Sequence, residues 1–190
     1  MSVQRQKDMR IAQAQQGDLA AFEELVREHE RKIYNLCFST MGSAEDAADM
    51  AQETLLKAWR ALQRFDGRSS LGTWLYRIAV NTCLDELRRR KNRTTVSIQN
   101  LAEKGWEPED DGGDFVERSI QREEVRQALR ELPDDYRTVL ILRDIQGFSY
   151  DEIADILSCP VGTVRSRLNR ARGNMVKKLT GGEQKKRRSV

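Results

Sequence analysis

The feature that most constrains this chain is a pair of short amphipathic helices predicted between Gly147 and Arg172. Ser149 and Glu152 have the spacing of a capping box, which marks the start of the first helix. Pro160 stands near the start of the second helix, where its missing N–H costs nothing. Two short helices joined by a tight turn are typical of a helix-turn-helix, whose second helix enters the DNA major groove.

The second of these helices has a predicted buried side and a predicted DNA-facing side. Its apolar residues recur every three or four positions, namely Val161, Val164, Leu168, Ala171 and Met175. The opposite side carries side chains that can bond to base edges, namely Arg165, Ser166, Asn169 and Arg170. Arg167 and Arg172 flank this side and suit phosphate contacts. A solvated basic face is the weaker interpretation, because the arginines alternate with serine and asparagine.

Charge is segregated along the chain, although the net charge is only +3. Residues 94–124 hold nine acidic and three basic side chains, a net charge of −6. Residues 159–190 hold ten basic side chains and one acidic side chain, a net charge of +9. A basic end of this kind is typical of a nucleic-acid binder. For the last basic run, 185–188, a solvated tail is the better interpretation.

Composition excludes several classes of protein. No run in the 190 residues approaches the roughly 20 apolar residues of a membrane span, and the N-terminal residues lack the apolar core of a signal peptide. The three cysteines, Cys37, Cys83 and Cys159, are widely spaced and odd in number. They favour a reducing compartment over a disulfide framework, so we expect a cytoplasmic protein.

The first half of the chain, about 8–93, is predicted to be one helical unit. Asp18 can cap a helix that runs to about Thr40, and Gly42 ends it. Further helices are predicted over about 44–64, after a Ser43 cap, and over about 71–91.

Two surfaces of this unit are candidates for binding. The segment from Phe65 to Trp74 has aromatic residues at its ends and small residues between them, as a loop that accepts an unstacked base requires. The following helix ends in a basic cluster, which also suits the helix dipole. On the 44–64 helix, Leu56 stands among charged residues, as the centre of a protein interface does, although single exposed leucines are common.

The segment from Asn92 to about Phe115 is rich in glycine and acidic residues and predicts a flexible linker. Roughly 20 extended residues span up to about 70 Å, which is about two turns of duplex DNA. A second helical unit is predicted from about Val116, with Pro133 early in one of its helices and a buried run at 139–142.

No catalytic constellation, cofactor motif or metal-ligand cluster is predicted. The only histidine, His29, could join Cys37 in a metal site, but a core or boundary histidine is the better interpretation. The chain is therefore predicted to recognise its partners, and any chemistry would belong to one of them.

Four ordered motifs resemble the extracytoplasmic-function sigma factors of bacterial RNA polymerase. They are the stretches 46–60 and 73–82, the pair Leu132-Pro133, and the helix-turn-helix stretches 150–154 and 160–167. The resemblance covers nearly the whole chain. It implies an all-α protein with sigma domain 2 at 1–93, a flexible acidic linker at 94–115, sigma domain 4 at 116–182 and a basic tail at 183–190.

The resemblance also implies site residues and partners. The clamp coiled coil of core RNA polymerase would bind Asp49, Gln52, Glu53 and Leu56. The minus-ten element of promoter DNA would be read and melted by Phe65, Arg68, Ser69, Trp74, Tyr76, Arg77, Asn81 and Arg88. The minus-thirty-five element would be read by Arg165, Ser166, Asn169 and Arg170, with Arg167 and Arg172 on the DNA phosphates beside them. The outer surface of domain 4 would meet the polymerase flap. An anti-sigma factor is an expected partner.

A free-standing helix-turn-helix regulator is the main alternative, and a helical nuclease is a more distant one. The regulator would explain the second unit but gives no reason for the face around Leu56. The nuclease would need metal-binding carboxylates that the sequence does not place convincingly.

Overall fold

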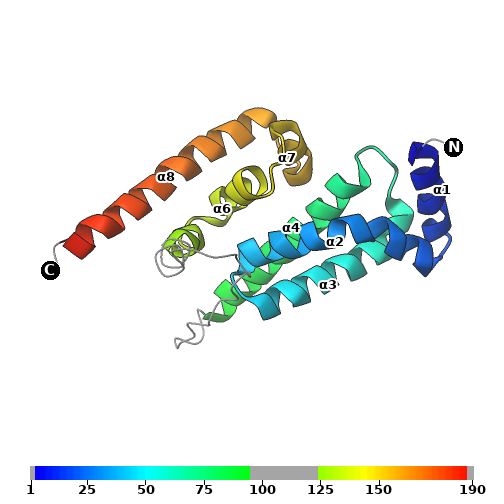
Figure 1. Ribbon diagram of the computed structural model, residues 1–190, viewed down its shortest axis with the longest axis horizontal. Coiled ribbons are helices and arrows are strands. Elements are labelled where there is room, and N and C mark those ends of the chain that lie inside the picture. The colour runs from blue at the N-terminus through cyan, green and yellow to red at the C-terminus, as the bar shows by residue number, and fades with distance from the viewer. Residues whose placement is uncertain (1–2, 95–123, 188–190) are drawn as a thin grey trace, which may run out of the picture.

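The computed structural model describes residues 3–94 and 124–187, with side chains over 6–92 and 124–180. Figure 1 shows two groups of helices. The first contains α1 (Val3–Gln15), α2 (Leu19–Met41), α3 (Ala44–Ala61), the 3-10 turn η1 (Leu62–Arg64) and α4 (Leu71–Thr94). The second contains a helical stretch at 124–130, α6 (Asp134–Leu140), the π-turn η2 (Ile141–Ile145), α7 (Tyr150–Leu157) and α8 (Val161–Arg187).

Within the described ranges every regular element is helical, which confirms the all-α prediction. The predicted linker lies outside the described residues, apart from Thr94 at the end of α4, and so does the predicted start of the second unit at Val116. The helix α8 continues to Arg187 and so includes most of the predicted basic tail. No helix of these ranges is long and apolar enough to cross a bilayer.

Capping residues place the helix ends where the sequence predicts them. The Asp18 side chain accepts a hydrogen bond from the Ala21 N–H, and α2 begins one residue after Asp18. Gly42 ends α2 with a φ of 81°, a left-handed conformation that glycine adopts without steric cost. The Ser43 hydroxyl accepts from the Asp46 N–H at the start of α3, as predicted.

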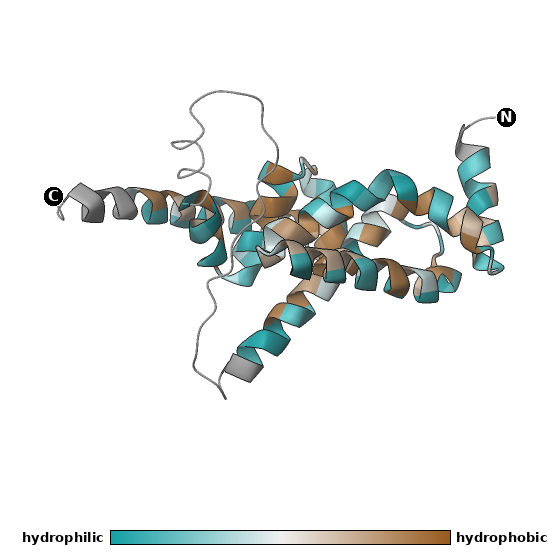
Figure 2. Ribbon diagram, turned by 60° about the horizontal axis from the view of Figure 1, so that its bottom comes forward, coloured by the Kyte–Doolittle hydropathy of each residue, from teal (hydrophilic) through white to brown (hydrophobic). Residues whose placement is uncertain are grey.

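The core of the first unit forms where α2 packs against α3 and α4. The side chains of Ile33, Leu36, Leu62 and Leu75 are almost fully buried there. Figure 2 shows apolar residues gathered where the helices meet and hydrophilic residues on their outer sides. Cys37 and Cys83 lie in this core as free thiols, and Cys159 is free as well.

The second unit is a smaller helical group around the buried run predicted at 139–142. Val139, Ile141 and Leu142 are fully buried and pack with apolar residues of α7 and α8. Arg137 is buried among them, a feature that the apolar pattern does not predict. Its guanidinium donates to the carbonyl oxygens of Leu129, Arg130 and Leu132 at 3.0, 2.6 and 3.1 Å. It thereby holds the end of the 124–130 helix, whose last carbonyls have no partners within the helix.

The two units touch where α4 meets α7, the turn before α7 and the start of α6, and also where α2 meets η2. The rings of Tyr76 and Phe148 meet edge to face, with centroids 4.8 Å apart. The Arg77 guanidinium binds the backbone carbonyl oxygen of Asp155, and the Lys91 ammonium binds the Asp134 carboxylate at 2.7 Å.

Candidate nucleic-acid and protein interfaces

The helix-turn-helix is formed by α7 and α8. Both bonds of the predicted capping box are present: the Glu152 N–H donates to the Ser149 hydroxyl, and the Ser149 N–H donates to the Glu152 carboxylate. The turn passes through Ser158, which has a φ of 50°. The helix α8 follows directly after Pro160.

The faces of α8 match the predicted division. Val164, Leu168 and Ala171 are buried against the rest of the second unit. The four predicted base-reading residues are all exposed, namely Arg165, Ser166, Asn169 and Arg170. One exposed face of the helix therefore presents two guanidinium groups, a hydroxyl and an amide, the groups that pair with base edges.

The two predicted phosphate-contacting arginines of α8 have carboxylate partners within the second unit. Arg167 pairs with Asp135 at 2.7 Å and is the less exposed of the two. Arg172 binds Asp144 through two hydrogen bonds of 3.2 and 2.6 Å, and this pairing raises the pKa of Arg172. Both pairs tie α8 to the elements beneath it, so these arginines orient the helix in this structure.

Arg143 braces the turn ahead of α7, a role that the sequence pattern does not reveal. It donates to the carbonyl oxygen of Phe148 at 2.8 Å, and its guanidinium carbon lies 5.2 Å from the centroid of the Tyr150 ring.

The predicted base-accepting segment forms a loop, Phe65–Ser70, between η1 and α4. Phe65 is only 8% exposed, and its ring centroid lies 5.2 Å from that of the half-buried Trp74. Gly67 has a φ of 72° at the tip. Arg68 is highly exposed, and its N–H donates to the Asp66 carboxylate at 3.1 Å, whereas Ser69 is half-buried. The aromatic pair therefore forms the base of the loop, and the polar tip is open to solvent.

Beyond Trp74, the other four predicted minus-ten residues on α4 fall into two groups. Asn81 and Arg88 are exposed, and Arg88 pairs with Asp85 at 3.2 Å. Tyr76 is 4% exposed because Phe148 and His29 cover it, and burial raises its pKa to about 12. Arg77 is engaged with α7. The closed contact between the two units thus covers part of the predicted DNA surface.

A groove of about 530 Å³ separates α3 from α4. All four predicted polymerase-binding residues line it, and they share the groove with Met50, Lys57, Thr82, Asp85, Glu86 and Arg89. Leu56 is 43% exposed, so its apolar side chain is available at the rim. The α4 side of this groove was not predicted, because the register between two helices is not visible in a sequence pattern.

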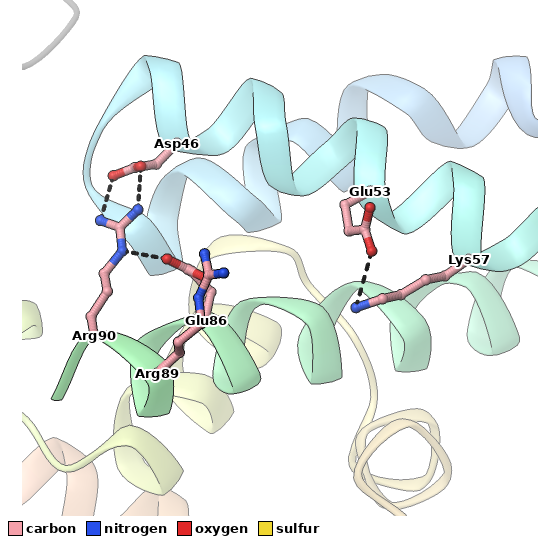
Figure 3. Close-up of polar contacts among 6 residues, drawn as sticks. All are labelled: Asp46, Glu53, Lys57, Glu86, Arg89 and Arg90. Carbon is pink, nitrogen blue, oxygen red and sulfur yellow. Dashed lines mark hydrogen bonds and ion pairs between the residues drawn. The ribbon is translucent and has the colours of Figure 1, made fainter. Parts of the chain in front are cut away.

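Arg90 joins α3 to α4 next to Glu86, a residue that lines this groove, and Figure 3 shows these contacts. Its guanidinium binds the Asp46 carboxylate of α3, with one contact at 2.8 Å, and the Glu86 carboxylate of α4 at 2.8 Å. The bond from Arg90 lowers the pKa of Asp46. Farther along the groove, Lys57 and Glu53 form an ion pair at 3.6 Å.

His29 lies at the boundary of the core, as predicted. Its Nδ1 atom lies 3.3 Å from the Tyr76 hydroxyl, and burial lowers its pKa. No group of three or more histidine, cysteine or acidic side chains suited to a metal ion occurs among the described residues.

Comparisons with known proteins match both units. The family model for Sigma-70 region 2 matches residues 25–93, and that for Sigma-70 region 4 matches residues 122–175. The RNA polymerase sigma-H factor of Pseudomonas aeruginosa is 40% identical over 186 residues, which are 94% of this chain and 96% of that protein. The ECF RNA polymerase sigma factor SigW of Bacillus subtilis is 36% identical, over 90% of this chain and 95% of that one.

Solved structures agree with these relatives. The sigma factor RpoE from Bartonella quintana, in complex with the anti-sigma factor NepR, has a TM-score of 0.69 at 28% identity, over 84% of this chain and 96% of that one. CnrH, in complex with the cytosolic domain of CnrY, has a TM-score of 0.67 at 26% identity, over 91% of this chain and 96% of that one. Similarity of this extent in sequence and in fold shows that the chain belongs to the extracytoplasmic-function sigma factors of RNA polymerase.

Proposed function

We propose that this sigma factor gives core RNA polymerase its promoter specificity through three surfaces. The observation that carries the proposal is the exposed face of α8, where Arg165, Ser166, Asn169 and Arg170 stand opposite a fully buried stripe. This face would read the minus-thirty-five element in the major groove. The arginines Arg167 and Arg172 would hold the helix in position and contact phosphates from its edges.

The Phe65–Ser70 loop and α4 would read and melt the minus-ten element. Support comes from the exposed tip of the loop and from the exposed side chains of Asn81 and Arg88 on α4. A base extruded from the duplex would lie against the exposed tip, which the Phe65–Trp74 pair supports from the base of the loop. Tyr76 and Arg77 would reach DNA after α7 leaves α4.

The groove between α3 and α4 would bind the clamp coiled coil of the polymerase. The groove has an exposed leucine, Leu56, surrounded by polar and charged side chains. Protein interfaces commonly have such an apolar centre and a polar rim. The chain would act in recognition and the polymerase would supply the chemistry, in the cytoplasm where that enzyme works.

The proposed organisation is domain 2 at 1–93, a linker at 94–115, domain 4 at 116–182 and a basic extension at 183–190. An anti-sigma factor is a proposed partner. Among the structures similar to this chain, the sigma factor RpoE is bound to the anti-sigma factor NepR, and CnrH is bound to the cytosolic domain of CnrY. Such a partner would block the polymerase-binding or DNA-binding surfaces.

Transcription in vitro with core polymerase tests the proposal. Promoter-specific transcripts that require both proteins are the expected result, with loss of upstream-element selectivity for Arg170→Ala. A free-standing regulator would instead bind a specific site tightly without polymerase, and that outcome would contradict the proposal.

A further inference from the structure

The helix α1 ends at Gln15, which contacts the start of the Phe65–Ser70 loop. The Sigma-70 region 2 match begins at residue 25, so α1 lies outside it. The helix nevertheless packs against α2, where Lys7 pairs with Glu28 and Arg10 pairs with Glu24 at 2.9 Å. Ala14 is 2% exposed, which places the last turn of α1 against the core.

Gln15, the last residue of α1, reaches the start of the loop. Its side-chain amide donates to the carbonyl oxygens of Leu62 and Phe65, at 3.1 and 2.9 Å. An amide nitrogen carries two hydrogens, so it can serve both acceptors at once. Leu62 is the first residue of η1, and Phe65 is the residue directly after η1. Gln15 is half-buried, which shields these bonds from competition by water.

The bond to Phe65 fixes the direction in which the loop leaves the core. The Phe65 carbonyl belongs to the peptide plane that joins Phe65 to Asp66, and a peptide plane moves as a rigid unit. At the other end of the loop, the Ser70 hydroxyl accepts from the Thr73 N–H at 3.0 Å and so caps α4. Between these two anchors the tip has internal bonds between Asp66 and Arg68.

We propose that Gln15 is a positioning residue for minus-ten recognition, which acts by holding the Phe65 carbonyl and thereby the loop that receives the extruded base. The inference depends on the proposed role of this loop. The helix α1, which lies outside the Sigma-70 region 2 match, would then affect promoter selectivity through Gln15 without contacting DNA.

The test compares the full-length protein with its Gln15→Met variant, which keeps the length of the side chain but cannot donate. Each is assembled with core polymerase and transcribes a promoter library randomised over both elements. We expect Gln15→Met to reduce the preference at one or more minus-ten positions by roughly tenfold, since the Phe65 carbonyl loses this donor and the Leu62 carbonyl keeps the Phe65 N–H. Preferences at the minus-thirty-five element and the affinity for core polymerase should not change.

Two further variants sharpen the result. Gln16→Met changes the exposed neighbour of Gln15 in the same way and should behave as the wild type. Gln15→Lys restores a donor of similar reach and should recover part of the minus-ten preference. Unchanged preferences in Gln15→Met, equal losses at both elements, or no recovery in Gln15→Lys would each overturn the inference.

The same library separates this inference from the proposed function. Arg68→Ala and Ser69→Ala alter the loop itself. If they shift minus-ten preferences while Gln15→Met does not, only the role of Gln15 fails. If neither loop variant has an effect, the assignment of the loop fails, and with it the inference.

Discussion

Arg77 of α4 donates two hydrogen bonds, of 3.1 and 2.7 Å, to the backbone carbonyl oxygen of Asp155 in α7. Beside this contact, Phe148 packs edge to face on Tyr76 and leaves it 4% exposed. Arg77 and Tyr76 are both candidates for contact with the minus-ten element. In this closed arrangement the second unit therefore covers part of the proposed DNA surface of the first, and promoter binding through that surface would require the two units to separate.

The contact predicts that Phe148→Ala opens the free protein. The substitution removes the ring that covers Tyr76, so the two units should spend more time apart. The separation is measured by energy transfer between two dyes attached to Leu19→Cys and Val176→Cys, two exposed positions on different units. Cys159→Ser removes the one native cysteine among the described residues that is not buried. We expect lower transfer efficiency in the free Phe148→Ala protein and no difference once either protein is bound to core polymerase.

Asn169→Ala is a suitable control for this experiment, because Asn169 is exposed on α8 and its loss should leave the transfer efficiency unchanged. Equal efficiencies for Phe148→Ala and the wild type would show that the ring contact does not hold the units together.

Two arginines of α8, Arg170 and Arg172, should have different effects on promoter selectivity when replaced. Arg170 is exposed on the predicted base-reading face, so Arg170→Ala should cost about 1–3 kcal/mol of discrimination at one or two base pairs of the minus-thirty-five element. Arg172 is held by Asp144, so Arg172→Ala should weaken transcription on all sequences alike. Transcription from a minus-thirty-five library by each holoenzyme distinguishes the two patterns. A uniform loss for Arg170→Ala would make it a phosphate contact.

Leu56 should be an energetic centre of the polymerase interface. Burying a carboxylate in an apolar contact is unfavourable, so Leu56→Asp should weaken binding to core polymerase by at least about 2 kcal/mol. Competition against the wild-type protein for core polymerase measures this change. Leu19→Asp is a matched control, because Leu19 is similarly exposed but lies outside the groove. Equal losses for both variants would argue against the proposed interface.

The sequence predicts those parts of this fold that depend on local patterns. Asp18, Ser43 and Ser149 all cap helices as their spacing indicates, because a cap involves only residues within the same turn. The buried and exposed faces of α8 follow from helical periodicity in the same way.

The remaining features depend on contacts between distant residues. Gln15 meets Phe65 across 50 positions, and Arg90 meets Asp46 across 44. No periodic pattern relates such residues. Arg137 is unpredictable for another reason: burial of a guanidinium among carbonyl oxygens contradicts the usual position of arginine at the surface.

Arg137 should contribute strongly to the stability of the second unit. Arg137→Met keeps an apolar stem but leaves the carbonyl oxygens of Leu129 and Leu132 in a buried site without this donor. We expect a loss of about 2–4 kcal/mol in the free energy of unfolding, measured by urea denaturation. Arg130→Met, a change at an exposed position of the same region, should cost less than about 1 kcal/mol. Similar costs for the two variants would contradict the clamp role of Arg137.

His29 should make stability depend on pH in a defined direction. Burial lowers its pKa, and the charges of Lys7 and Lys32 act in the same sense, whereas Glu28 at 3.4 Å opposes them. The unfolded chain then binds a proton more readily than the folded chain between the lowered pKa and the ordinary value of about 6.5. The free energy of unfolding therefore has its full value, as far as His29 is concerned, above about pH 6.5. It decreases as the pH falls from about 6.5 toward the lowered pKa of His29.

The comparison of wild type with His29→Gln isolates this effect, because glutamine does not titrate. The difference in unfolding free energy between the two proteins, measured in urea from pH 7.5 to 5, should shift in favour of the variant as pH falls. The carboxylates with lowered pKa values, such as Asp46 and Glu152, are retained in both proteins and lose their contribution only at lower pH. A difference that stays constant over this range would show that His29 titrates alike in the folded and unfolded chains, and that its burial against Tyr76 has no electrostatic cost.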